Sequence, residues 1–112
     1  MRISAGRLRG RSIVMPKRHE FRPTSQKVRE AVFSSLSSMG VLDGARLLEL
    51  YAGSGAFGLE AFSRGVAEVV FVEKNREATQ AITKSLELFS LEAEVVAQDV
   101  FKFLDNCSSK FS

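Results

Sequence analysis

The sequence predicts an α/β protein with a parallel, doubly wound sheet, and two observations support this fold class. From residue 46 onward, short apolar segments alternate with amphipathic segments of helical length, in the order β-α-β-α-β-α. The chain has 112 residues, 45% hydrophobic and 26% charged, which is the composition of one globular domain and not of a disordered chain.

Several classes of protein are excluded by what the sequence lacks. No apolar run approaches the ~18 residues of a membrane span. No apolar stretch follows Met1, as it would in a secretory signal. The single Cys107 cannot form an internal disulfide, and together with the lone His19 it cannot build a zinc site. We therefore expect no membrane association, no metal and a reducing, cytoplasmic setting.

Residues 1–22 are expected to form a short basic arm ahead of a mildly acidic body. Residues 1–30 carry a net charge of +7, whereas residues 31–112 carry −4. Weak alternation on both sides of Gly6 and Gly10 predicts a small hairpin in this arm. Such an asymmetry favours a polyanionic partner, most often nucleic acid, and the alternative is a solvated basic surface.

A first helix is expected after Pro23, which ends any earlier helix. Thr24 or Ser25 can cap it, and it extends to about Ser38. Its expected buried face consists of apolar residues at helical spacing: Val28, Ala31, Val32 and Leu36.

Three strands are expected near residues 46–50, 68–73 and 93–97, parallel and in the spatial order third, second, first. A helix over 57–64, closed by Gly65, would connect the first two strands. Asn75 would cap the next helix, whose expected buried face is Ala78, Ile82, Leu86 and Phe89.

The pattern of the last twelve residues leads us to expect that the chain continues beyond Ser112. A helical turn runs through Phe101 and Leu104, and residues 107–112 resemble a loop entering another strand. Because three parallel strands leave a long unpaired edge, we expect this to be the front part of a longer protein. The expected organisation is a basic arm over 1–22 and the front part of the α/β domain over 23–112.

A glycine-rich loop follows the first expected strand. Gly53, Gly55 and Gly58 form a Gly-x-Gly-x-x-Gly pattern between a strand and a helix, with Ala52 and Ser54 inside the loop. Without Cβ atoms at these positions the chain can turn tightly, and a ligand can approach the backbone amides. The pattern predicts a nucleotide-like ligand, and the structural alternative is a tight turn.

Three carboxylates indicate which ligand this is. Glu49, Glu73 and Asp99 lie at or after the ends of consecutive strands, so they would share one edge of the sheet. Glu49 would repel a pyrophosphate but could accept hydrogen bonds from an ammonium group, as S-adenosylmethionine offers. Glu73 could hold the ribose hydroxyls, and Asp99 an adenine amine. A dinucleotide-dependent oxidoreductase, disfavoured by Glu49, stays an alternative, and each carboxylate taken singly could be a helix cap or a solvated charge.

These segments resemble RsmD-type enzymes, bacterial methyltransferases that modify a guanine N2 in 16S ribosomal RNA, the RNA of the small subunit. The resemblance covers residues 1 to about 104 and is carried by residues 2–11, 22–24, 28–33, 48–61 and 63–65. It implies a Rossmann-like, S-adenosylmethionine-dependent methyltransferase fold, truncated here after about three strands. The implied cofactor-binding residues are Glu49, Ala52, Gly53, Ser54, Gly55, Gly58, Glu73 and Asp99.

The sequence departs from the family pattern in two places. The family commonly has Asp at the position of Glu49, whose role we expect to survive one added methylene. The family's Asp/Asn-Pro-Pro-Phe/Tyr motif, which would hold and stack the guanine, is absent, because the only prolines are Pro16 and Pro23. We therefore expect no catalytic residue in this chain and no activity from it alone.

The expected partner is ribosomal RNA or the small ribosomal subunit, and a monomer is expected. Candidate RNA-binding residues are Arg7, Arg9, Arg11, Arg22 and Arg29. The first three alternate and would project to one face of an extended strand, whereas Arg29 could instead pair with Glu30. A nucleic-acid-binding module with a vestigial glycine loop is the remaining alternative.

Overall fold

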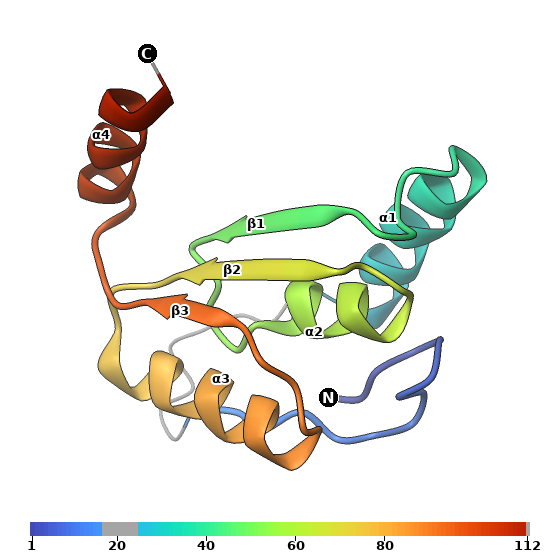
Figure 1. The fold of residues 1–112 in the computed structure, drawn as a ribbon. Helices are drawn as coiled ribbons and strands as arrows, with labels where there is room; N and C mark the ends of the chain where they lie inside the picture. Colours follow the sequence, from blue (N-terminus) through green and yellow to red (C-terminus); the bar gives the residue numbers. More distant parts are fainter. Residues whose placement is uncertain (17–24, 112) are drawn as a thin grey trace.

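The computed structural model describes residues 1–16 and 25–111, with side chains up to Asn106. Figure 1 shows a small parallel sheet with helices around it. The described elements are α1 (Gln26–Ser38), β1 (Arg46–Leu50), α2 (Ala56–Ser63), β2 (Glu68–Val72), α3 (Arg76–Leu88), β3 (Glu94–Val96) and α4 (Val100–Phe111). The expected α/β class and the alternation of strands and helices are confirmed.

The three strands are parallel and lie in the order β1-β2-β3, as the crossover rule predicts. Leu50 of β1 is in register with Val72 of β2, which is in register with Val96 of β3. The three strands therefore end together, and the segments that follow them share one carboxyl edge.

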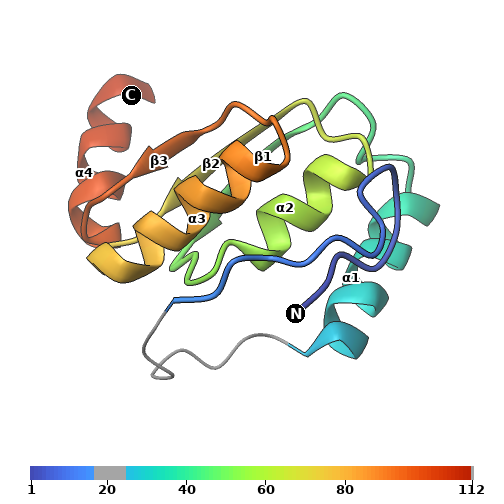
Figure 2. The ribbon, with the colours of Figure 1, turned by 90° about the horizontal axis from the view of Figure 1, so that it is seen from below.

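Helices α2 and α3 cover one face of the sheet, as Figure 2 shows from below. The core between them contains Leu59, Phe71 and Ile82, all fully buried. On the opposite face Leu48 of β1 is 47% exposed. Gly58 allows the close packing of α2, because an added Cβ would lie 2.3 Å from Cε1 of Phe71. The two-layer arrangement thus depends on a glycine facing an aromatic ring.

The N-terminal segment forms the expected hairpin and packs into the same core. An antiparallel bridge joins Arg2 to Ser12, and the buried side chains are Ile3, Leu8 and Ile13. The expected extended strand through the arginines is wrong. Residues 6–10 form a turn instead, in which Gly6 and Gly10 both have a φ of 85°. The two glycines favour a turn because this backbone conformation is unstrained only for glycine.

Helix α1 begins where the sequence predicts but buries a different face. Ser25 caps it by accepting a hydrogen bond from the amide of Val28 at 3.2 Å. Val28 is 51% exposed and Val32 40% exposed, whereas Arg29 and Phe33 are buried. The expected face is therefore wrong at Val28, Ala31 and Val32, which are exposed, and right at Leu36, which packs against the core. The stripe that faces the core in place of the first three starts with a charged residue, Arg29.

The C-terminal end is also corrected. Residues 107–111 continue α4 and do not form a loop into another strand. Asp99 precedes this helix and accepts hydrogen bonds from the amides of Phe101 and Lys102. This cap satisfies two amides of the first turn and favours a helix from Val100 onward. Among the residues that the structure describes, no helix has the length and apolar character needed to cross a membrane.

Candidate cofactor-binding site

The candidate site lies at the carboxyl edge of the sheet, where backbone hydrogen bonds connect the ends of the three strands. The amide of Ala52 donates to the carbonyl of Val72 at 3.1 Å, and the amide of Glu73 donates to the carbonyl of Val96 at 3.1 Å. These bonds extend the pairing beyond the strands. They place the glycine loop beside the end of β2, and Glu73 beside the end of β3.

The glycine loop is a tight turn that leads directly into α2. Gly53 and Gly55 have φ values of 57° and 76°, in the left-handed region that favours glycine. The amide of Gly55 donates to the carbonyl of Ala52 at 2.8 Å and closes the turn. Ser54 between them is buried. Gly55 is also the N-cap of α2, so it brings no side chain to the amides of the first helical turn.

Glu49 supplies the cap that Gly55 lacks. Its side chain reaches from β1 to α2, where Oε1 accepts a hydrogen bond from the amide of Gly58 at 2.8 Å. Burial raises the pKa of Glu49 to about 7, against the opposing effect of hydrogen bonds from the Gly58 and Phe57 amides. The nearby charge of Glu73 raises that pKa further. The pKa of the Glu49 carboxyl group therefore lies well above its ordinary value.

Glu73 holds the other end of the glycine loop. Its Oε1 accepts from the amide of Gly53 at 2.9 Å, and its Oε2 accepts from the amide of Asn75 at 2.9 Å. The residue is only 7% exposed. The carboxylate therefore ties β2, the loop and the start of α3 together.

Asp99 stands apart from the other two carboxylates. It is partly exposed, and both of its hydrogen bonds, from Phe101 at 3.1 Å and Lys102 at 3.3 Å, use Oδ2. Its Oδ1 accepts no hydrogen bond from the described residues. Asp99 lies at the expected edge, and its contacts in this structure are those of a helix cap.

Tyr51 is a feature of this edge that the glycine pattern alone did not single out. It has a φ of 53° and is 65% exposed, directly before the loop. A left-handed conformation is strained for a tyrosine, by roughly 1–2 kcal/mol. Strained residues gather at functional sites. The signal in the sequence is an aromatic residue between the strand and the first glycine.

The candidate RNA-binding arginines are not gathered at this edge. The turn with Arg7 and Arg9 is held by Ser63 at the end of α2, where the Arg7 amide donates to the Ser63 carbonyl at 3.0 Å. Helix α2 has 8 residues and starts at the glycine loop, so it separates the turn from the cofactor edge by about 12 Å. Both side chains are exposed.

The other three arginines differ from these two. Arg11 is exposed but donates to the carbonyl of Leu88 at 3.2 Å, and its guanidinium lies 4.9 Å from the centre of the Phe89 ring. Arg22 lies outside the described residues. Arg29 is fully buried, which corrects the expectation that it reaches RNA. It forms an ion pair, but with Glu60 of α2 and not with Glu30.

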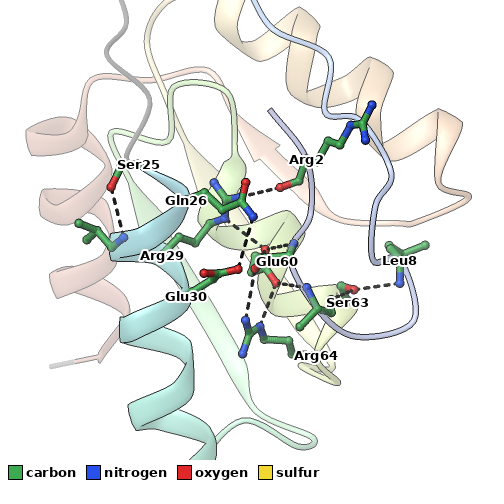
Figure 3. Close-up of polar contacts among 12 residues, drawn as sticks. Arg2, Leu8, Ser25, Gln26, Arg29, Glu30, Glu60, Ser63 and Arg64 are labelled. Atoms are coloured by element: carbon green, nitrogen blue, oxygen red, sulfur yellow. Dashed lines mark hydrogen bonds and ion pairs between the residues drawn. The ribbon is translucent and has the colours of Figure 1, made fainter.

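Glu60 is the centre of a polar cluster that anchors the hairpin and α1 to α2, and Figure 3 shows it in close-up. Its carboxylate is fully buried and pairs with Arg29 at 3.1 Å and with Arg64 at 2.9 Å. It also accepts hydrogen bonds from the backbone amides of Ser4 and Ala5. Burial acts to raise the pKa of Glu60, but these hydrogen bonds and Arg64 outweigh it and lower that pKa.

Solved structures with similar chain traces define the class of protein. The structure of a hypothetical protein from Thermus thermophilus matches with a TM-score of 0.86 and 36% identity, over 100% of this chain and 63% of that one. A Pyrococcus abyssi tRNA (uracil-54, C5)-methyltransferase in complex with S-adenosyl-L-homocysteine matches with a TM-score of 0.54 and 25% identity, over 71% of this chain and 20% of that one. The chain has a Rossmann-like fold of the S-adenosylmethionine-dependent methyltransferase class, with a three-stranded parallel sheet.

The family follows from the sequence comparison. The chain belongs to the family described as Conserved hypothetical protein 95, whose model matches residues 1–112. One relative is the ribosomal RNA small subunit methyltransferase D of Escherichia coli K12, 38% identical over 105 residues. The match covers 93% of this chain and 52% of that protein, so the chain spans about half the length of this relative. The resemblance to the RsmD-type enzymes is confirmed.

Proposed function

We propose that this chain is the cofactor-binding part of an S-adenosylmethionine-dependent methyltransferase that modifies a guanine N2 in small-subunit ribosomal RNA. The observation that carries the proposal is the pair of carboxylates at the two ends of the glycine loop. Glu73 holds the amide of Gly53, and Glu49 holds the amide of Gly58. A loop flanked by two carboxylates suits a ligand that is cationic near the loop, and it disfavours a pyrophosphate.

The parts of the cofactor can be assigned to this chain by their chemistry. Glu49 would accept hydrogen bonds from the ammonium group of the methionine end. Glu73 would accept from the ribose hydroxyls, and Oδ1 of Asp99 from the adenine amine. The relative with bound S-adenosyl-L-homocysteine supports this choice of ligand class.

The chemistry of methyl transfer makes positioning the main contribution of the protein. The bound cofactor supplies an electrophilic methyl group on its sulfonium, and the acceptor nitrogen must lie in line with it. The residues of this chain would hold the cofactor from one side and fix the loop geometry. The name of the Escherichia coli relative supports small-subunit rRNA as the substrate, and the guanine N2 position follows from the family resemblance.

The RNA would reach the protein on a second surface. Arg7 and Arg9 are exposed on the hairpin turn, and neither side chain has a partner among the described residues. They would make salt-dependent contacts to phosphates. Each phosphate that they neutralise would steepen the slope of log K against log salt by about one. Because the turn lies at the far end of α2, these contacts would orient the RNA and would not touch the reacting base.

Labelling of RNA tests this function. Small-subunit rRNA from cells that lack the corresponding methyltransferase is incubated with S-adenosylmethionine and either the chain or the protein that continues it. We expect mass spectrometry to locate the added methyl on a guanine N2 with the continued protein and no transfer with the 112-residue chain. Binding of NAD in place of S-adenosylmethionine would overturn the cofactor assignment, and a methyl on another base would overturn the substrate assignment.

A further inference from the structure

Tyr51 is an aromatic side chain that the fold leaves uncovered at the candidate site. It is 65% exposed, whereas Ala52 and Ser54, which follow it in the loop, are buried. Among the side chains that the structure describes, no other aromatic ring stacks on it, and no guanidinium or ammonium group lies over it. Packing within the described chain therefore does not account for an aromatic residue at this position.

The backbone of Tyr51 adopts a conformation that is unstrained only for glycine. Its φ is 53°, and the next two residues with a left-handed φ are glycines, Gly53 at 57° and Gly55 at 76°. Tyr51 thus brings strain to the first of three left-handed positions without adding a buried side chain. Strain of this kind is typical of residues whose side chain has a function.

The end of β2 fixes where Tyr51 lies. Leu50, directly before it, is in register with Val72, and the amide of Ala52, directly after it, donates to the carbonyl of Val72 at 3.1 Å. The backbone of Tyr51 is therefore tied to the neighbouring strand on both sides, and its exposed ring stands at the carboxyl edge of the sheet.

The parts of the cofactor that are assigned above place its sulfonium near this residue. Glu49, assigned to the ammonium group, precedes Tyr51 by two residues. The amide of Gly53, two residues after Tyr51, donates at 2.9 Å to Glu73, which is assigned to the ribose. In S-adenosylmethionine the sulfonium joins the ribose to the methionine end that carries the ammonium group. The charged sulfur therefore corresponds to the point between these two carboxylates, where Tyr51 lies.

We propose that the ring of Tyr51 contacts the sulfonium of the bound cofactor and thereby distinguishes S-adenosylmethionine from S-adenosyl-L-homocysteine. The face of an aromatic ring carries partial negative charge and attracts a cation. The product has a neutral thioether in place of the sulfonium, so the ring attracts it less. This inference rests on the proposed function and adds a residue that selects the methyl-bearing form of the cofactor over the spent form.

Calorimetric titration with each of the two ligands measures this selection. The quantity of interest is the dissociation constant of S-adenosyl-L-homocysteine divided by that of S-adenosylmethionine. Tyr51→Leu keeps an apolar side chain but loses the ring, and we expect the ratio to fall by about 2–5-fold. Tyr51→Phe keeps the ring and should keep the ratio. Leu88→Ala, at an apolar position of α3 that is 61% exposed, is the control and should leave both constants unchanged.

Tyr51→Gly separates a binding role from a packing role. Glycine adopts the left-handed conformation without strain, so this variant should unfold at a higher temperature than Tyr51→Leu. Its ratio of dissociation constants should nevertheless fall by the same factor. A gain in stability together with a loss of ligand selection is expected of a strained binding residue and not of a packing residue.

The outcomes distinguish the inference from the function on which it rests. Equal weakening of both ligands in Tyr51→Leu, or a ratio that falls as far in Tyr51→Phe, would overturn the inference and leave the cofactor assignment standing. An unchanged ratio in Tyr51→Gly would also overturn it, so this variant decides alone if Tyr51→Leu does not fold. A wild-type chain that binds neither ligand would overturn the proposed function itself.

Discussion

Arg29 of α1 donates from Nε to Oε1 of Glu60 on α2 at 3.1 Å, and both side chains are fully buried. The Nη2 of Arg29 donates in addition to the carbonyl of Arg2 at 2.6 Å. One guanidinium therefore joins α1, α2 and the N-terminal hairpin, as Figure 3 shows. Because α2 begins at the glycine loop, this contact anchors the helix that carries the candidate cofactor site.

Replacing Arg29 should destabilise the protein strongly. Arg29→Met removes the charge that pairs with Glu60 in the interior, and breaking a buried pair costs about 3–5 kcal/mol. Chemical denaturation measures the loss in the free energy of unfolding. Arg46→Ala is the matched control, because Arg46 and Glu68 pair at 2.8 Å with side chains that are 81% and 62% exposed. Such a surface pair contributes at most about 1 kcal/mol. Equal losses in the two variants would contradict the structural role of Arg29.

Gly58→Ala should disturb the packing of α2 on the sheet. The added Cβ would lie 2.3 Å from Cε1 of the fully buried Phe71, so the helix or the ring must shift. Overpacking of this kind costs typically about 1–3 kcal/mol. Gly40→Ala is the control, because its Cβ would meet nothing within 4 Å and only the φ of 70° is unfavourable. Thermal denaturation should show the larger decrease in Tm for Gly58→Ala, and cofactor binding should weaken in that variant alone.

The stability of the cofactor-free protein should depend on pH through Glu49. Its folded-state pKa of about 7 lies above the ordinary value of 4.5, so the folded state binds the proton more tightly. This contribution is fully present below pH 4.5 and is lost as the pH rises through 7. Glu49→Gln lacks this titration. The free energy of unfolding of the wild type relative to Glu49→Gln should therefore fall between pH 5 and pH 8, by at most about 3 kcal/mol. A constant difference across this range would contradict the burial of an ionisable Glu49.

The hairpin turn should contribute to RNA affinity without touching the cofactor. Replacing Arg7 and Arg9 together with Ala should weaken binding of small-subunit rRNA and reduce the slope of log K against log salt by up to about two phosphate contacts. Affinity for S-adenosyl-L-homocysteine should stay unchanged, because the turn lies at the other end of α2. Arg46→Ala at the same end of the sheet is the control. An unchanged salt slope in the double variant would make the turn an ordinary solvated surface.

Much of the fold could be predicted because local pattern and backbone chemistry agree along β1, β2 and α3. Asn75 caps α3 by accepting from the amide of Ala78 at 3.0 Å, and the predicted apolar face of that helix is buried. The strand register then brings Glu49 and Glu73 to one edge. In these segments burial follows the apolar pattern.

The errors arise where distant residues decide the structure. On α1, the stripes that begin at Val28 and at Arg29 have the same helical spacing, and charged residues are rarely buried unless they are paired. The partner of Arg29 is Glu60, 31 residues further along the chain, so no local pattern indicates which stripe faces the core. The alternating arginines of the hairpin are misleading for a different reason, because Gly6 and Gly10 make a turn where an extended strand is expected.

Calorimetric titration of S-adenosyl-L-homocysteine into the wild type and into Glu73→Ala tests the central claim most directly. Glu73 supports the loop at Gly53 and is the assigned ribose ligand, so its removal should weaken binding by roughly 1.5–3 kcal/mol, the range for hydrogen bonds to charged groups. Glu94→Ala, at an exposed position of β3, should bind as the wild type does. An unchanged dissociation constant in Glu73→Ala would contradict the assignment of this edge as the S-adenosylmethionine site.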